Sequence, residues 1–548
     1  MVPVFQGGAI MKLIDEVGEH PALEYVSPNH EQALSMMVDG YAHIKGFGVG
    51  MATSGPGAQN MVTGIACAYY DSIPCMFITG QVGMFHMKGT RAVRQRGFQE
   101  TDVVSIVKSI TKYAVLLDKA ENARYIFEKA VHMAKSGRPG PVLIDIPYNI
   151  QRAIVNPAEL KGYTPEEELL KAKQDLDKSI SDIFDDLKKS ERPVILLGGG
   201  VDIAGQADTI RKLVLKFQVP VVVTWCALDI FEADNPLYGG TVGRAGNKSA
   251  NRIIRGADFV LAFGTRFAWK AIIDENNFTN KAKLVAVDID SGELEDGFVS
   301  AQVKLQFDLK EFLPRMLRAA EKVTVPPKKD WLAVVAQIKN DYFRTDTLPK
   351  GSSYLNPYDF TEALSEALPP NTILVGDTGT NLCWFTHAYR AKIGQRFIAS
   401  WGNSPMGYAL PASVGAHLAN KDAMTVVING DGGMQMNIQE LQTIALHQFP
   451  IKVFVLNNDC YANVKFPSID QFEGRFHALG RGMGYGAPDF VKIAGAYGIP
   501  AFALKKGDDL MKKIKEALLM TGPVVVDVKL DPEQRAFEDD ELVLPLPK

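Results

Sequence analysis

The sequence predicts an α/β fold, in which strands and helices alternate along the chain. The clearest unit is an apolar strand over 425–429, a helix over 438–446 and a second apolar strand over 451–456. The outer two segments are continuously apolar and the middle one has helical spacing, as in a buried parallel sheet covered by helices. The segment 193–200 looks like the start of another such unit, because its apolar strand enters a glycine turn that leads to a helix.

The length of the chain predicts several domains. At 548 residues it exceeds one hydrophobic core, and a size of roughly 100 to 200 residues per domain gives about three. The charged stretch 166–189 separates a first domain from a second, and the prolines and lysines of 326–329 and the loop 350–353 separate the second from a third. We therefore expect domains over 1–165, 175–325 and 350–535, followed by a C-terminal tail over 536–548.

Composition excludes several classes of protein. The formal net charge is −4 and the basic residues are dispersed, so we expect no nucleic-acid partner. We find no apolar run long enough to span a bilayer and no cleavable leader, so we expect no membrane partner and a cytoplasmic protein. The five cysteines lie far apart without metal-ligand spacing, which favours reduced thiols in that compartment.

Polar residues follow both strands of the clearest unit. Gly430-Asp431-Gly432 comes after the strand 425–429, and Asn457-Asn458 comes at the end of the strand 451–456. Ligands of α/β sheets bind at the carboxyl ends of strands, and a carboxylate with an amide oxygen suits Mg²⁺ bound to a diphosphate. The alternative is two ordinary βα turns, in which Gly and Asn supply positive φ.

Four further segments follow one another in a fixed order near the start of the chain: His30-Glu31-Gln32, Asp39-Gly40-Tyr41-Ala42, 53–60 and 71–81. Together with the residues around Asp431, they resemble the acetolactate synthase group of thiamine diphosphate (ThDP) enzymes. The resemblance implies three doubly wound parallel-sheet domains. The first binds the pyrimidine, the central one resembles a nucleotide-binding domain, and the third binds the diphosphate.

The resemblance also implies roles for residues of the first domain. Glu31 would hydrogen-bond N1′ of the aminopyrimidine and drive the tautomer that deprotonates C2 of the thiazolium. Taken alone, Glu31 could instead be an acidic residue at a helix N-terminus. The other catalytic residues that we expect, lining the cleft over C2, are Gln81, Phe98 and Gln99. The pyrimidine-side cofactor contacts that we expect are Gly7, Pro56 and Asn60.

In the third domain the resemblance implies that Asp431, Asn458 and the backbone carbonyl of Cys460 hold Mg²⁺. Met406 would support the bent cofactor under its thiazolium ring, the alternative being an ordinary core methionine. The other expected cofactor contacts of this domain are Asn403, Ser404, Gly430, Gly432, Gly433 and Tyr461.

The central domain resembles the segment that binds FAD in acetolactate synthases and ADP in some decarboxylase relatives. Glycines allow backbone amides to approach a pyrophosphate, and a carboxylate at a strand end suits ribose or adenine. We expect FAD as an additional cofactor, and the alternative is a structural domain with an empty cleft. The expected contacts are Gly199, Gly243, Arg266 and Asp288.

The acceptor determinants differ from those of the synthases. Lys270 stands where they carry an Arg that holds a second 2-ketoacid, and Phe466-Pro467-Ser468 stands in place of Gln-Trp-Gln. We therefore predict ThDP- and Mg-dependent decarboxylation of a 2-ketoacid, first of all pyruvate, with transfer of its two-carbon unit to another carbonyl. A branch associated with surface-sugar biosynthesis suggests a keto-sugar nucleotide as this acceptor. Acetolactate synthase proper, a decarboxylase or C–C hydrolase of the same fold, and a noncatalytic scaffold remain open.

The resemblance finally bears on assembly and on the start of the chain. In the family, the pyrimidine-side Glu and the diphosphate-side Asp of one site come from different subunits, which implies a homodimer or homotetramer. Relatives carry a helix and part of a strand before the segment that begins here at Val2. We therefore expect that the chain starts late or has been shortened.

Overall fold

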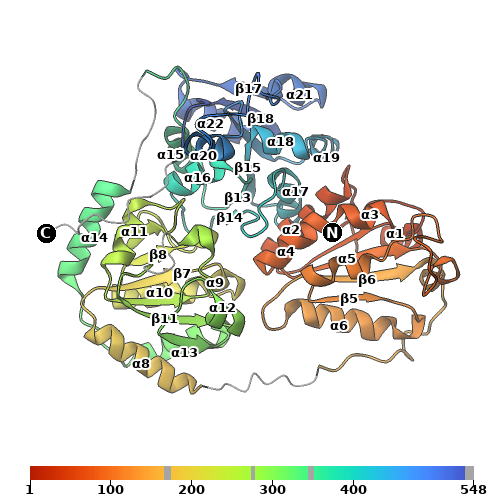
Figure 1. The fold of residues 1–548 in the computed structure, drawn as a ribbon, viewed down its shortest axis with the longest axis horizontal. Helices are drawn as coiled ribbons and strands as arrows, with labels where there is room; N and C mark the ends of the chain where they lie inside the picture. Colours follow the sequence, from red (N-terminus) through yellow and green to blue (C-terminus); the bar gives the residue numbers. More distant parts are fainter. Residues whose placement is uncertain (166–173, 273–277, 344–350, 537–548) are drawn as a thin grey trace.

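The computed structural model describes residues 1–165, 174–272, 278–343 and 351–536. Residues 166–173 of the expected linker, residue 350, and all but the first residue of the expected tail lie outside these ranges. The described strands form three larger parallel sheets and a short parallel pair. Each larger sheet and its helices make one lobe, and the lobes meet around a common centre (Figure 1).

The first lobe has the strand order β3-β4-β6-β5, and the pair β1-β2 joins it through a bridge between Val4 and Met51. Its strands are β1 (Val2–Pro3), β2 (Tyr25–Val26), β3 (Gly48–Ala52), β4 (Cys75–Gln81), β5 (Tyr113–Leu116) and β6 (Val142–Pro147). Its helices are α1 (Met11–Glu19), α2 (Glu31–Lys45), α3 (Pro56–Asn60), α4 (Val62–Asp71), α5 (Val103–Val107), α6 (Ala123–Lys135) and α7 (Tyr148–Gln151).

The central lobe has the strand order β12-β11-β10-β7-β8-β9. Its strands are β7 (Pro193–Leu197), β8 (Val221–Val223), β9 (Tyr238–Thr241), β10 (Phe259–Phe263), β11 (Lys283–Asp288) and β12 (Val303–Gln306). Its helices are α8 (Leu176–Lys189), α9 (Gly200–Ile203), α10 (Ala207–Phe217), α11 (Lys248–Gly256), α12 (Ser291–Asp296), α13 (Leu309–Ala320) and α14 (Lys329–Tyr342). Helix α14 follows residue 325 and still packs on this sheet, through Trp331, Val335 and Ile338.

The third lobe has the strand order β14-β13-β15-β16-β18-β17. Its strands are β13 (Thr372–Gly376), β14 (Arg396–Ile398), β15 (Met424–Gly430), β16 (Lys452–Asn457), β17 (Ala501–Leu504) and β18 (Val524–Lys529). Its helices are α15 (Pro357–Ala367), α16 (Thr380–Ala388), α17 (Ala409–Ala419), α18 (Asp431–Met436), α19 (Glu440–His447), α20 (Ala462–Gln471), α21 (Phe490–Ala496) and α22 (Leu510–Leu519).

The predicted strand-helix-strand unit lies in this lobe. Strands β15 and β16 are parallel neighbours, as expected from the two apolar segments. The expected helix over 438–446 is present as α19, which starts at Glu440, and an additional helix, α18, starts directly at Asp431 and ends before Asn437. The pattern missed α18 because Gly432 and Gly433 are poor helix formers, which are held here by packing rather than by propensity.

Each larger sheet buries apolar side chains on both faces. In the third sheet, Val426 and Phe454 lie in one hydrophobic cluster, whereas Val427, Val453 and Val455 lie in another on the opposite face. The first and central sheets likewise contribute to two clusters each. Helices therefore cover both faces of each sheet, and the predicted class of three doubly wound α/β domains is confirmed.

Helices α2 and α17 join the first and third lobes and lie side by side (Figure 1). A Cβ atom on Gly415 would lie 1.9 Å from the carbonyl oxygen of Met37, and one on Gly40 would lie 2.1 Å from that of Ala412. The two backbones approach closely because both positions lack a side chain. The hydroxyl of Tyr408 donates a hydrogen bond to Asp39 in the same crossing.

Two further expectations concern cysteines and membranes. All five cysteines are free thiols. Among the described helices we find none with the length and apolar character required to cross a bilayer.

Candidate active site

Asp431 is a buried carboxylate with one unused oxygen. It follows β15 as the first residue of α18, and only 3% of it is exposed. Its Oδ1 accepts the backbone N–H of Gly432 at 2.9 Å, whereas Oδ2 is buried without a hydrogen bond. Burial raises the pKa of Asp431 to about 7. A cation beside Oδ2 would compensate the buried charge, so this residue fits the expected Mg²⁺.

The expected partners of Asp431 come from the adjacent strand. Gly430 pairs with Leu456 in the β15–β16 ladder, so the residues after both strands meet at one edge of the sheet. Asn458 is buried just after β16, and Asn457 instead uses its amide to donate to Asp527 at 2.9 Å. The Cys460 thiol lies 3.5 Å from the carbonyl oxygen of Pro532, and oxygen donors rather than this sulfur suit Mg²⁺.

The turn after β15 leaves no room for side chains. A Cβ atom on Gly432 would lie 2.3 Å from the Tyr461 ring and 2.8 Å from Cε of Met406, and one on Gly433 would lie 2.0 Å from Oδ2 of Asp377. Met406 therefore lies directly against the predicted diphosphate turn. Gly430 lies beside Asn381.

The segment before Met406 divides its contacts between two lobes. Ser404 has a φ of +51° and its hydroxyl lies 2.6 Å from that of Thr378, which follows β13. Asn403 instead turns to the first lobe of the same chain, where its amide donates to the carbonyl oxygen of Thr63 at 3.3 Å. Ser404 is thus grouped with the diphosphate turn, and Asn403 is not.

Two residues of this cluster were missed. Asp377 is fully buried after β13, its carboxylate accepts the backbone N–H groups of Thr378 and Gly407, and burial raises its pKa to about 7. It follows a strand that neighbours β15, so the rule that parallel strands end at one edge could have found it. Tyr485 packs its ring 4.0 Å from that of Tyr461 and faces Asp431. It comes from a glycine-rich loop that carries no periodic signal.

Glu31 begins the second half of the site, at the first position of α2. It is 8% exposed, and its Oε2 accepts the side-chain amide of Asn60 at 2.9 Å. His30 caps the helix by accepting the N–H of Gln32 at 3.0 Å. Glu31 is therefore an acidic residue at a helix N-terminus. Its carboxylate lies between Asn60, the last residue of α3, and the start of that helix, where a Cβ atom on Gly57 would lie 3.4 Å from Oε1.

The other expected residues of the first lobe fall into two groups. Gly7 lies against Thr53, Pro56 starts α3, and Gln99 lies against Gly55 with a φ of +60°, so these surround the same turn as Glu31. The side chain of Gln81 is buried, and its amide donates to Asp145 at 2.8 Å and to the carbonyl oxygen of Thr101 at 2.7 Å. Phe98 is 86% exposed on the loop after β4.

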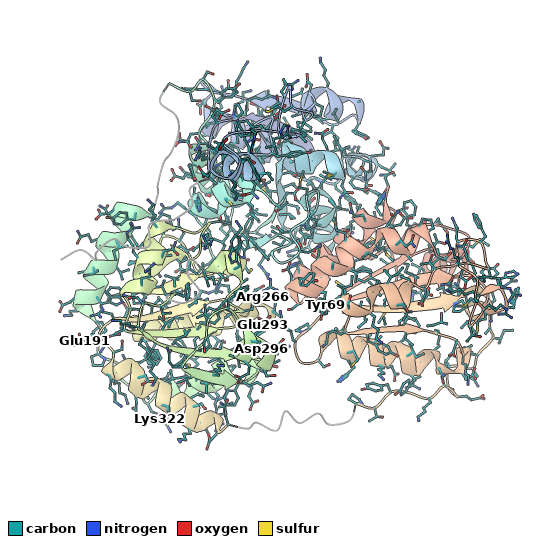
Figure 2. The ribbon with its side chains drawn as sticks, in the orientation of Figure 1. Tyr69, Glu191, Arg266, Glu293, Asp296 and Lys322 are labelled. Carbon is teal, nitrogen blue, oxygen red and sulfur yellow. The ribbon has the colours of Figure 1, made fainter. Side chains whose placement is uncertain are left out.

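The central lobe borders a cleft of about 1270 Å³, part of which is open to solvent. Gly199, Arg266 and Asp288 line it, whereas Gly243 lies elsewhere, with its would-be Cβ 2.2 Å from the carbonyl oxygen of Lys270. Burial raises the pKa of Asp288 to about 6. Figure 2 shows Arg266 on the side of the central lobe that faces the first lobe, where its guanidinium donates to the carbonyl oxygen of Tyr70 at 2.7 Å.

The glycine turn from Gly198 to Gly200 lines the cleft, but the other arginines of the cleft are engaged. Arg138 donates to Asp290 at 2.8 Å and to Glu293 at 2.7 Å. Arg396 binds the carboxylates of Asp202 and Asp229. A pyrophosphate bound there would have to use backbone amides of the glycine turn or displace a carboxylate from an arginine.

Comparison with known proteins matches each lobe to a family model. Residues 2–106 match the thiamine pyrophosphate enzyme, N-terminal TPP binding domain; residues 180–316 match its central domain; and residues 377–528 match its C-terminal TPP binding domain. The chain is also similar over nearly its whole length to acetolactate synthases. The probable large subunit of Methanocaldococcus jannaschii is 33% identical, over 97% of this chain and 89% of that protein.

The chain belongs to the ThDP-dependent, acetolactate synthase-like enzyme family. Two other members extend the comparison across kingdoms. The isozyme 1 large subunit of Escherichia coli K12 is 33% identical over 97% of this chain and 91% of its own, and acetolactate synthase 1, chloroplastic, of Nicotiana tabacum is 33% identical over 96% and 78%. The expectation of a ThDP-dependent enzyme is thereby confirmed.

Proposed function

We propose that this enzyme uses ThDP and Mg²⁺ to decarboxylate a 2-ketoacid and transfers the remaining unit to a carbonyl acceptor. The favoured 2-ketoacid is pyruvate. The observation that carries the proposal is the buried, unpartnered Oδ2 of Asp431 at the edge where β15 and β16 end. It provides a place for a cation in a chain whose relatives are named acetolactate synthases. ThDP, when bound, supplies the electron sink for the decarboxylation.

The residues of this chain would bind and orient. Asp431, Asn458 and the carbonyl oxygen of Cys460 would hold Mg²⁺, and the turn of Gly432 and Gly433 would admit a diphosphate. Glu31 would hold a proton against the aminopyrimidine nitrogen, with Asn60 fixing the direction of its carboxylate. Because both carboxyl groups are buried, water is largely excluded around them.

The acceptor would differ from a second 2-ketoacid. The ammonium of Lys270 lies 5.0 Å from the centre of the Trp269 ring and does not supply the bidentate contact of a guanidinium. Pro467, within α20, stands where the synthases carry a Trp. The loop after β4 exposes Arg91, Arg94 and Arg96. Glu100 organises this loop by accepting backbone N–H groups, including that of Arg96 at 2.9 Å. An anionic acceptor such as a keto-sugar nucleotide suits these arginines.

Acetolactate synthase proper remains the second candidate, because the relatives carry that name. The test is CO₂ release from pyruvate with and without ThDP and Mg²⁺, and the mass of each product, with pyruvate alone and with an added keto-sugar nucleotide. Ligation to the sugar supports the proposal, and acetolactate from pyruvate alone supports the synthase. Aldehyde without ligation indicates a decarboxylase, and absence of CO₂ refutes pyruvate as donor. The double variant Lys270→Arg, Pro467→Trp should raise acetolactate yield if these positions choose the acceptor.

We further propose a homodimer or homotetramer whose sites combine Glu31 of one subunit with Asp431 of another, acting in the cytoplasm. FAD in the central cleft is part of the same proposal. The mass of the assembly by light scattering and the visible absorption of the purified protein test these two points. A monomer that retains full specific activity on dilution refutes shared sites, and colourless protein that does not take up FAD refutes the flavin.

A further inference from the structure

The residues around Glu31 are anchored to the third lobe of the same chain. Asn29, two positions before Glu31, donates its backbone N–H to Oε1 of Glu440 at 3.0 Å. Its side-chain amide donates to the carbonyl oxygen of Gln439 at 3.2 Å and to the hydroxyl of Thr443 at 2.9 Å. The start of α2 is therefore held by the first turn of α19, 411 residues later in the chain.

Glu440 is the buried centre of this anchor. None of its surface is exposed, and its second oxygen accepts the hydroxyl of Thr443 at 2.8 Å. Burying a carboxyl group costs free energy unless hydrogen bonds replace its water, and here both oxygens have one. It lies outside the set of residues expected to touch the cofactor, so the predicted chemistry does not by itself require an acid at this position.

Asn437 makes a second link on the other side of Glu31. Its amide donates to Oε1 of Gln32 at 3.3 Å and to the carbonyl oxygen of Gly407 at 2.8 Å. Gly407 directly follows Met406, which lies against the diphosphate turn. Residues 29 and 32 are thus both tied to the third lobe, and Glu31 lies between them at the first turn of α2.

We propose that Glu440 is a positioning residue for Glu31. It fixes the backbone of Asn29, and through it the direction in which the first turn of α2 presents the Glu31 carboxylate to the aminopyrimidine. This proposal rests on the proposed function, in which Glu31 holds a proton against the aminopyrimidine nitrogen of ThDP. The hydrogen bond from Asn60 restrains only the end of the Glu31 side chain. A displacement of about 1 Å in a catalytic group lowers rates by about a hundredfold, so an anchor of the backbone matters as well.

The test uses the variants Glu440→Ala, Glu440→Gln and Glu440→Met, with Glu516→Ala as a control on the exposed surface of α22. The readouts are the affinity for ThDP with Mg²⁺ and the rate at which the C2 proton of bound ThDP exchanges with deuterium, measured without substrate. Glu440→Ala should keep its ThDP affinity within about threefold and lose about a hundredfold in exchange rate. Glu440→Gln should recover most of that loss, because its amide oxygen can still accept the N–H of Asn29.

The outcomes separate this inference from the proposed function. If the wild-type protein does not accelerate C2 exchange, the proposed function itself fails. If the wild-type protein accelerates C2 exchange and the Glu440→Ala variant exchanges at the same rate, Glu440 has no positioning role. If Glu440→Ala does not fold, Glu440→Met decides, because it keeps the length of the side chain and removes both oxygens that accept hydrogen bonds. It should lose about a hundredfold in exchange rate, and a rate equal to that of the control variant would overturn the proposal.

Discussion

Replacing Gly415 with Ala should destabilise the junction of the first and third lobes. The new Cβ atom would lie 1.9 Å from the carbonyl oxygen of Met37, whereas ordinary van der Waals contact begins at 3.4 Å. Helices α2 and α17 would have to separate by about 1.5 Å. The obstacle is backbone, which cannot rotate away as a side chain can.

The size of the effect follows from two opposing terms. Overpacking costs about 1 to 3 kcal/mol, and the upper end applies here because a helix backbone has to move. Alanine is favoured over glycine within a helix by about 1 kcal/mol. The net loss for Gly415→Ala is therefore about 2 kcal/mol. Gly495→Ala in α21 is the matched control, because its Cβ atom would meet nothing within 4 Å, and it should gain up to about 1 kcal/mol.

Urea unfolding followed by tryptophan fluorescence measures both variants. The midpoint should fall for Gly415→Ala and stay level or rise for Gly495→Ala, so that the two differ by about 3 kcal/mol. If Gly415→Ala unfolds at the same urea concentration as Gly495→Ala, the close approach of α2 and α17 does not make an added Cβ atom at position 415 destabilising.

Three other predictions concern buried carboxyl groups. Burial raises the pKa of Asp39 from 3.8 to about 8, so between these values the folded chain holds a proton that the unfolded chain releases, and stability falls as pH rises through this window. Asp39→Asn, which can still accept from Tyr408, should therefore gain in urea midpoint over the wild type between pH 5 and pH 8; a constant difference would contradict this. Asp431→Ala should weaken Mg-dependent ThDP binding by more than about a hundredfold in a calorimetric titration, and unchanged affinity would remove it from the metal site. Glu31→Gln should slow C2 exchange of bound ThDP by about 10² to 10⁴-fold while the cofactor still binds, and an unchanged rate would exclude its role as acid or base.

The sequence predicts the architecture well where burial is continuous. The runs 425–429 and 451–456 are apolar because both faces of their strands are covered, and this favours a parallel sheet even in one sequence. The expected end of the central domain at residue 325 leaves out helix α14, although Trp331, Val335 and Ile338 repeat at helical spacing and pack on the central sheet.

Long-range contacts explain what the sequence does not predict. Glu440 falls within a helix with an apolar stripe, where a charged residue is expected to face water, yet it is fully buried. The reason is Asn29, which no local pattern connects to it. Asp377 and Tyr485 similarly join the site only because the strand ends and loops around Asp431 meet in space.

The segment from Asp431 to Thr443 has two fixed ends. Asp431 opens it at the predicted metal site, and Asn437, Glu440 and Thr443 hold the first turn of α2. One residue inserted into a helix rotates everything after it by about 100°. This stretch should therefore reject single-residue insertions in a randomly lengthened library, whereas the turn at Gly507 between β17 and α22, whose Cβ position meets nothing within 4 Å, should accept them. Length as well as residue identity is under constraint at this point of the chain.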